Sequence, residues 1–284
     1  MLPESPARRA GLPAGRATAY AVGLVDDAAA LLPAADSVGV AITRHRADRR
    51  ADHGLVVGPV LAAVSRLGDV LDALDAAPTS EPLDLVLVAA TGLVEAGEAR
   101  SILLDDDRVE LLGLRVVLPV DGPLGDVARI TLDTLDFALP AAIEVPRAVG
   151  WRDALDVIAA DGAERAAFRA EGSTATELAA VVVAAVRRSL AFTVVDGLRD
   201  AVARTDADGV LHHGCVNVLA ATAATLDGRD EAAVAAMLEE TDAVVLLSVL
   251  AAADPRAVRR RFTSYASSSV SDAVADLDAL GMID

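Results

Sequence analysis

The sequence predicts an α/β barrel of the TIM type, built from seven or eight parallel strands. Short apolar runs rich in β-branched residues alternate with longer alanine-rich stretches of helical period through the middle of the chain. Six of these runs begin at positions 55, 83, 109, 141, 165 and 191, in steps of 28, 26, 32, 24 and 26 residues. A chain of 284 residues suits a closed barrel, which needs about 250, better than an open sheet.

Each expected strand is a short apolar run, and each expected helix carries its apolar residues on one face. Strands are expected at 19–25, 55–62, 83–89, 109–118, 141–145, 165–170 and 191–195, with a possible eighth at 261–266. Helices are expected at 37–50, 66–76, 94–103, 127–137, 151–160, 174–188 and 270–280. Ser173 or Thr174, followed by Glu177, is typical of a capping box at the start of a helix.

One domain is expected from residue 16 to residue 284, because no linker rich in Gly, Ser or Pro divides the chain. Residues 1–15 contain three prolines and are expected to form a disordered leader. Between about 210 and 253 the pattern indicates two or three helices and no strand. We therefore expect a helical insertion beside the barrel, near the C-terminus.

The composition excludes several classes of function. The chain has no lysine, so all 25 basic residues are arginine, and Schiff-base and P-loop lysine chemistry are excluded. The 43 acidic residues give a net charge of −18, which argues against nucleic acid or an anionic membrane surface as a partner. One cysteine and no spaced set of metal ligands predict no disulfide and no preformed zinc site. A soluble, cytoplasmic protein is expected, because no apolar run approaches the roughly 18 residues of a membrane span.

Candidate catalytic residues follow the expected strands, since the working groups of such barrels lie at the carboxyl ends of strands. Asp26 follows the first strand, Asp196 ends the seventh, and His213 stands before an apolar helix with Asn217 about one turn further on. These side chains could transfer protons or, for Asn217, bind a ligand. The alternative is that the acids cap helices or form ion pairs and that the histidine is a loop residue without a function.

Candidate ligand-binding residues form a second set on the same side of the expected sheet. Arg147, Arg169 and Arg199 could bind a carboxylate or phosphate, while Gly172 and Gly197 would let the anion approach backbone amides. The competing interpretation is that the three arginines pair with local acids in structural ion pairs. The sequence supports both interpretations equally.

Several stretches resemble a family of bacterial proteins of similar length. They are residues 24–29, 57–59 with 65–67, 213–219, and the C-terminal 261–269 with 275–277. One motif of that family resembles the lysine-bearing strand of deoxyribose-phosphate aldolase-like barrels. In this chain it corresponds to residues 192–200, with Thr193 at the place of the lysine and with Arg199 and Asp200 at the places of two histidines. The resemblance implies a barrel whose aldolase chemistry, if it depends on that lysine, is lost or altered here.

Two functions from different classes remain open. The first is a metabolic enzyme of lyase or aldolase type, or its degenerate relative, that binds a small anionic metabolite, phosphorylated ones included. The second is a non-catalytic ligand-binding or protein-interaction module, with a partner docking on the apolar helices around 244–250. The sequence identifies no cofactor, and it leaves homo-oligomerisation open.

Overall fold

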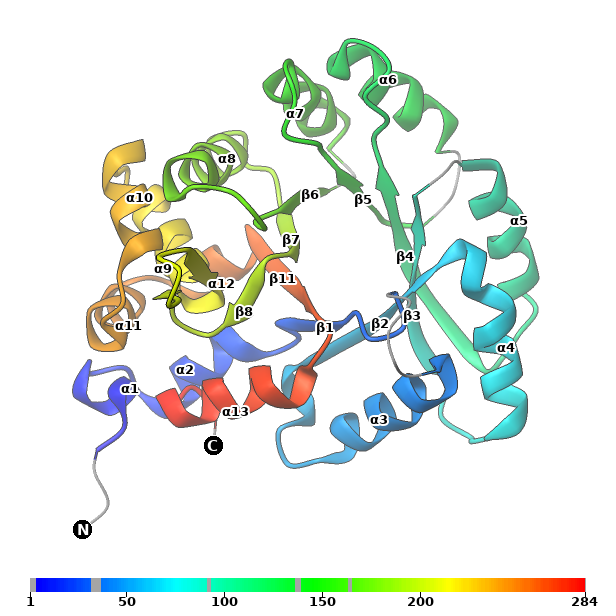
Figure 1. The fold of residues 1–284 in the computed structure, drawn as a ribbon, viewed down its shortest axis with the longest axis horizontal. Helices are drawn as coiled ribbons and strands as arrows, with labels where there is room; N and C mark the ends of the chain where they lie inside the picture. The colour runs from blue at the N-terminus through cyan, green and yellow to red at the C-terminus, as the bar shows by residue number, and fades with distance from the viewer. Residues whose placement is uncertain (1–3, 32–36, 91–92, 136–138, 163–164, 284) are drawn as a thin grey trace.

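The computed structural model describes residues 4–31, 37–90, 93–135, 139–162 and 165–283. Eight parallel strands form a closed barrel surrounded by helices, which confirms the predicted fold (Figure 1). The strands are β1 (Val25–Asp27), β2 (Val57–Ala63), β3 (Leu83–Ala89), β4 (Val109–Val117), β5 (Ala141–Glu144), β6 (Arg165–Arg169), β7 (Phe192–Asp196) and β11 (Phe262–Ser267). They follow one another around the ring in this order, and β11 pairs with both β7 and β1 to close it.

Helices connect successive strands and cover the outside of the barrel. They are α3 (Val38–Arg50), α4 (Leu67–Ala76), α5 (Leu93–Leu103), α6 (Leu124–Thr134), α7 (Trp151–Asp161), α8 (Ala175–Arg187) and α13 (Val270–Leu280), with short 3-10 turns at Gly54–Val56 and Val64–Arg66. The predicted capping box is confirmed at α8, where the Glu177 amide donates to Thr174 Oγ1 at 3.2 Å and the Thr174 amide donates to Glu177 Oε2 at 2.8 Å. Residues 136 and 137 of the helix expected at 127–137, before the fifth strand, lie outside the described residues.

The expected leader and the expected first strand are both wrong. Residues 6–9 and 14–21 form helices α1 (Pro6–Arg9) and α2 (Ala14–Ala21), and the first strand begins only at Val25. Ala17, Tyr20 and Ala21 share the buried face of α2 at helical spacing, and the Tyr20 hydroxyl donates to the Leu250 carbonyl at 2.8 Å. Burial of these side chains orders the N-terminal region, although residues 1–3 lie outside the described part.

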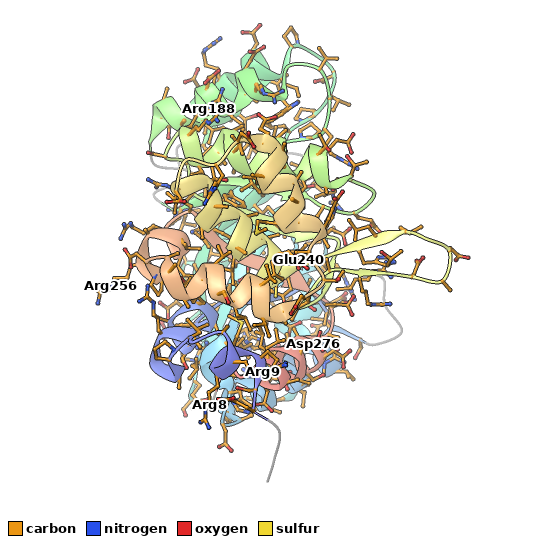
Figure 2. The ribbon with its side chains drawn as sticks, turned by 90° about the vertical axis from the view of Figure 1, so that its left-hand side faces the viewer. Arg8, Arg9, Arg188, Glu240, Arg256 and Asp276 are labelled. Atoms are coloured by element: carbon orange, nitrogen blue, oxygen red, sulfur yellow. The ribbon has the colours of Figure 1, made fainter. Side chains whose placement is uncertain are left out.

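The insertion between β7 and β11 contains strands as well as the expected helices. A small sheet is formed by β8 (Leu198–Asp200), β9 (Arg204–Thr205) and β10 (Leu211–Gly214), in the order β8, β10, β9. Four helices follow: α9 (Cys215–Leu226), α10 (Glu231–Glu239), α11 (Ala243–Ala252) and α12 (Pro255–Arg259). The expectation of no strand is therefore wrong, because Asp206 accepts from the amides of Asp208 and Val210 and so turns the chain back as a hairpin that projects from the body (Figure 2).

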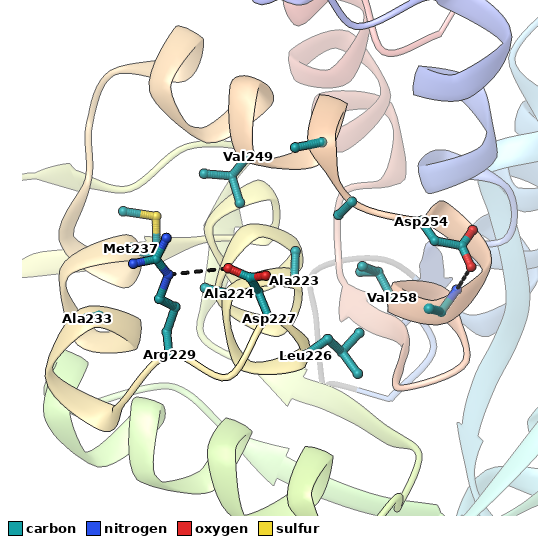
Figure 3. A pocket seen from close by; sticks show the side chains of 13 residues that line it. Ala223, Ala224, Leu226, Asp227, Arg229, Ala233, Met237, Val249, Asp254 and Val258 are labelled. Carbon is teal, nitrogen blue, oxygen red and sulfur yellow. Dashed lines mark hydrogen bonds and ion pairs between the residues drawn. The ribbon is translucent and has the colours of Figure 1, made fainter.

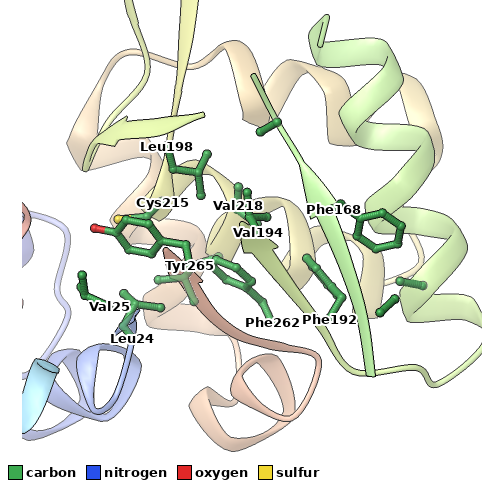
Figure 4. Close-up of a cluster of buried hydrophobic side chains, with 14 of the residues drawn as sticks. Leu24, Val25, Phe168, Phe192, Val194, Leu198, Cys215, Val218, Phe262 and Tyr265 are labelled. Carbon is green, nitrogen blue, oxygen red and sulfur yellow. The ribbon is translucent and has the colours of Figure 1, made fainter. Parts of the chain in front are cut away.

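The core lies mainly between the barrel and its helices. Phe192 of β7 and Phe262 of β11 stack with ring centroids 5.4 Å apart, and Phe168 of β6 lies 6.3 Å from Phe192 (Figure 4). Cys215 packs in the same cluster, hydrogen-bonded to Tyr265, and burial raises the pKa of its thiol to about 12. The single cysteine is therefore a core residue and not a nucleophile. Among the described helices, none combines the length and the apolar character needed to cross a bilayer.

Gly197 joins β7 to the insertion and gives a test of this connection. Its φ is +90°, and a Cβ at this position would lie 2.1 Å from the Glu171 amide nitrogen, so Gly197→Ala has both an unfavourable backbone conformation and a clash with backbone. We expect the substitution to lower the free energy of unfolding by more than about 2 kcal/mol in urea unfolding. Gly209→Ala is the control, because its φ of +81° is similar but the space around it is open. If the two variants lose the same free energy of unfolding, the steric explanation is contradicted.

Candidate functional site

The interior of the barrel is polar and charged on one side. Along β4 to β7, alternate residues such as Leu114, Ile143 and Phe168 pack outwards into the main core. The residues between them therefore face the inside of the barrel, because successive side chains of a strand point to opposite faces. These inward positions include Arg115, Glu144, Arg169 and Thr193, whereas large branched apolar side chains usually fill such a barrel.

Four charged residues form a chain from the interior to the mouth. Arg115 Nε lies 3.5 Å from Glu144 Oε2, Arg169 Nε donates to Glu144 Oε1 at 2.7 Å, and Arg169 Nη1 donates to Asp196 Oδ2 at 3.3 Å. The side chains of Arg115 and Glu144 are 7% and 4% exposed, while those of Arg169 and Asp196 are 52% and 42% exposed. The buried pair thus lies beneath an exposed pair that can exchange partners with solvent or a ligand.

Asp26 also lies inside the barrel, at one end of a row of hydrogen bonds that runs through Ser264 to Thr193. Ser264 Oγ of β11 donates to Asp26 Oδ2 at 2.6 Å, and Thr193 Oγ1 of β7 donates to the Ser264 carbonyl oxygen at 2.7 Å. Gly58 of β2 makes room for this carboxylate, since a Cβ there would lie 2.4 Å from Asp26 Oδ1. Thr193, at the position that corresponds to the lysine of the aldolase-like motif, thus contributes a hydroxyl to this row. We call Arg115, Glu144, Arg169, Asp196, Asp26, Ser264 and Thr193 the barrel cluster.

The environment of Asp26 favours its neutral form. Burial raises the pKa of Asp26 from 3.8 to about 6, against the lowering effects of the Ser264 hydrogen bond and the positive charges of Arg165, Arg115 and Arg259. The side chain is nevertheless partly exposed. An accessible carboxyl group with a pKa near 6 can both accept and donate a proton near neutral pH.

Asp27 has a different role from its neighbour. Asp27 Oδ2 lies 3.2 Å from His45 Nδ1 of α3, and Asp27 Oδ1 accepts from the Ala29 amide at 3.0 Å. The side chains of Asp27 and His45 are both 3% exposed. This pair faces the helices outside the barrel and fixes the turn after β1, so only Asp26 of the two adjacent acids faces the interior.

A second group of candidate residues lies beside the mouth, in a cleft of about 350 Å³. We call it the side cleft; it is lined by Ala170, Glu171, Gly172, Ser173, Thr174, Gly197, Arg199, Val210, Leu211, His212 and His213. Arg199 Nη2 lies 3.4 Å from Glu171 Oε1. Arg199 is thus paired with a local acid in the side cleft, outside the barrel cluster, and the exposed pair contributes little stability.

Arg147 lines a different groove, of about 580 Å³, between α7 and α8. Its Nη2 donates to the Glu171 carbonyl oxygen at 2.9 Å, and its Nη1 lies 3.7 Å from Glu177 Oε2. Arg147 therefore connects the loops after β5 and β6. Of the three arginines proposed as anion ligands, only Arg169 belongs to the barrel cluster.

His213 and Asn217 do not reach the barrel cluster. His213 is 2% exposed in the wall of the side cleft, and its Nε2 lies 3.0 Å from the Ser173 carbonyl oxygen, so Nε2 carries the proton. Asn217 is fully buried: its Oδ1 accepts from the Ala203 amide, and its Nδ2 donates to the carbonyl oxygens of Met237 and Glu240. The Asn217 amide thus joins the small sheet to α10, away from the barrel cluster, and its role in ligand binding stays a prediction.

A further hollow of about 560 Å³ lies between α9, α10, α11 and α12 (Figure 3). Alanine side chains make up much of its lining, and its charged residues have partners within the chain: Arg229 pairs with Asp227 at 3.4 Å, and Asp254 caps α12. On the adjacent α11, Leu246, Leu247 and Leu250 are fully buried. The most apolar side chains of 244–250 thus pack within the fold.

Comparison of the chain with protein-family models, with curated proteins and with solved structures found no match in any of the three. Within the described ranges, no group of three or more His, Cys, Asp or Glu side chains is arranged to hold a metal ion. The barrel cluster is therefore the feature of this chain from which a function can be inferred.

Asp26→Asn tests the raised pKa of Asp26. Because that pKa rises from 3.8 to about 6, the folded state holds this proton more tightly than the unfolded chain, and the corresponding stability is lost as pH rises through about 6. We expect Asp26→Asn and wild type to be equally stable near pH 4, with the variant about 3 kcal/mol more stable above about pH 7. Urea unfolding across this range measures the difference, and a difference independent of pH would contradict the assignment.

Ser264→Ala tests the hydrogen bond to Asp26. The Ser264 hydroxyl lowers the pKa of Asp26, so its loss should move that pKa upwards by about one pH unit. Titration of the carboxyl carbons by ¹³C NMR in aspartate-labelled protein measures the change. Ser101→Ala is the control, since the Ser101 hydroxyl donates to the Gly97 carbonyl on the exposed face of α5, away from Asp26. If the titration midpoint of Asp26 is unchanged in Ser264→Ala, the hydrogen bond between Ser264 and Asp26 is excluded.

Proposed function

We propose that this protein is an acid–base enzyme of the lyase type that acts on a small anionic metabolite at the carboxyl-terminal mouth of the barrel. The observation that carries the proposal is Asp26, a partly exposed carboxyl group with a pKa near 6 inside a charged barrel. A general acid–base group works best when its pKa lies close to the ambient pH.

The free-energy cost of burying the charged side chains of the barrel cluster supports a functional role for them. Replacing buried ion pairs by well-packed apolar residues is often neutral or stabilising, so stability alone does not explain a guanidinium and two carboxylates inside a barrel. Strongly perturbed ionisable groups gather at functional sites for the same reason. Three of its members, Glu144, Arg169 and Asp196, are the last residues of β5, β6 and β7, at the functional face of barrels of this type.

Arg169 is the residue we propose for binding the anion. Its Nη1 end is held only by Asp196, through an exposed pair at 3.3 Å, while its Nε end is anchored by buried Glu144. A substrate anion can take the place of the Asp196 carboxylate without moving the anchored end, because exposed ion pairs contribute little stability. Asp196 then lies beside the bound substrate.

The chemistry that fits these groups is proton abstraction from carbon. Asp26 in its carboxylate form accepts a proton from a carbon beside a carbonyl group, and the electron pair moves onto the carbonyl oxygen. A neighbouring guanidinium stabilises the negative charge that develops there. The chain has no lysine, so a Schiff base formed with a lysine amine has no part in this mechanism.

Exchange of carbon-bound hydrogen tests the proposal without knowledge of the products. Wild-type protein is incubated in D₂O with small 2-oxo acids, hydroxy acids and sugar phosphates, and loss of the C–H signal is followed by ¹H NMR. We expect exchange in at least one class, with a rate that rises as pH increases through about 6 and falls about 100-fold or more in Asp26→Asn.

Asp156→Asn is the control for this experiment, because Asp156 pairs with Arg188 on the outer surface of the barrel helices. Absence of exchange in every class, from folded protein, would sink the enzymatic proposal. It would favour the second candidate, a non-catalytic ligand-binding barrel, to which the threonine at position 193 and the paired Arg147 and Arg199 already point.

A further inference from the structure

Arg115 is a buried cation with unused hydrogen-bonding capacity. It lies in β4 and is 5% exposed, and within the described part of the chain neither its Nε nor its Nη1 has a hydrogen-bond partner. Glu144 is 3% exposed, and its Oε2, 3.5 Å from Arg115 Nε, also accepts no hydrogen bond. Buried polar groups nearly always have partners, and leaving a charged one without them costs stability.

The unused atoms are of complementary kinds. Arg115 offers N–H donors to an acceptor, and Glu144 Oε2 offers an acceptor to a donor. A ligand that satisfies both needs an oxyanion and, close to it, a hydroxyl or amine group. The neighbouring inward residues are small, since Ala142 is paired with Arg115 in the sheet and Ala167 is paired with Glu144. With Val195 these alanines form a small buried apolar cluster, so a ligand beside the two charged side chains has to be short.

The charge of the cluster limits the charge of the ligand. The cluster holds two guanidinium groups, of Arg115 and Arg169, against the carboxylates of Glu144, of Asp196 and, above its pKa of about 6, of Asp26. The acids therefore already balance the two arginines. A monoanion that displaces Asp196 from Arg169 adds one negative charge, whereas a phosphate dianion would add two next to Glu144 and Asp26.

We propose that the substrate of this site is a short hydroxy monocarboxylate, whose carboxylate is bound by Arg115 and Arg169 and whose hydroxyl donates to Glu144 Oε2. This inference rests on the proposed function and narrows its substrate class from small anions in general to hydroxy acids. It makes Arg115 a substrate-binding residue, and it makes Glu144 the residue that selects hydroxy acids over plain carboxylates.

Binding of glycolate, acetate and inorganic phosphate, measured by isothermal titration calorimetry, tests the substrate class. Acetate has the carboxylate without the hydroxyl, and phosphate has the higher charge. We expect glycolate to bind wild type about tenfold more tightly than either of the others, since the lost hydroxyl leaves Glu144 without a donor. Tighter binding of phosphate, or no binding of glycolate, would overturn the proposal and leave Arg115 solvated by water.

Variants then locate the site. Arg115→Met keeps an unbranched side chain but removes the N–H donors, so it should weaken the binding of glycolate about tenfold or more. Glu144→Gln should remove most of the preference for glycolate over acetate. Arg188→Met is the matched control, because Arg188 pairs with Asp156 on the outer helices, and this variant should bind glycolate as wild type does. Circular dichroism and thermal unfolding establish that each variant is folded.

A measurement on wild type covers the case in which Arg115→Met does not fold. In protein labelled with ¹⁵N-arginine, glycolate should shift a slowly exchanging Nε–H signal, because Arg115 is buried. If no such signal moves while glycolate binds, Arg115 is not the ligand.

The exchange experiment separates this inference from the proposed function. Exchange that depends on Asp26 and is insensitive to Arg115→Met would overturn the inference alone. Glycolate binding that depends on Arg115, without exchange in any class, would overturn the enzymatic proposal alone.

Discussion

The alternation of side chains along eight closed strands is the constraint on which the rest of the structure depends. In a closed ring every second residue of each strand must face the inside, whatever its chemistry. On β4 to β7 this rule sends Leu114, Ile143 and Phe168 to the helices, and it places Arg115, Glu144 and Arg169 together inside. The polar interior is thus a direct result of residue parity on adjacent strands.

Closure depends on a strand that arrives late in the chain. β11 enters the ring after the small sheet and four helices, and it brings Ser264 between Thr193 of β7 and Asp26 of β1. Without β11, Asp26 would have no hydroxyl donor and the edges of β1 and β7 would be unpaired. The insertion and the hydrogen-bonded row around Asp26 therefore depend on the same element.

The sequence predicted the architecture well because regular spacing and hydrophobic period report directly on repeated strand–helix units. It failed for residues 6–21, where the prolines indicated a leader, whereas contacts of α1 and α2 with α11 and α12 fix the chain in the structure. It also failed for β8 to β10, which have two to four residues each and are too short for a pattern of period two.

The candidate site was predicted in part. Asp26, Arg169 and Asp196 follow from the rule that functional groups end strands, and they do lie in the barrel cluster. Arg115 and Glu144 were missed, although each is a charged residue within an apolar strand, which was a usable signal. Ser264 could not be found from sequence, since its partner Asp26 is 238 residues away. The contacts of Asn217 could not be predicted either, because nothing local indicates that its partners come from other segments of the insertion.

Cys215 has a practical consequence for how the fold opens. It begins α9 and packs against Tyr265 on β11, so the thiol is covered only as long as the helical layer stays on the barrel. Because it is the single cysteine in the chain, the rate at which an alkylating reagent modifies this protein measures one event, the separation of α9 from the eighth barrel strand. The barrel thus carries a built-in reporter of local opening, positioned at the strand that closes the ring.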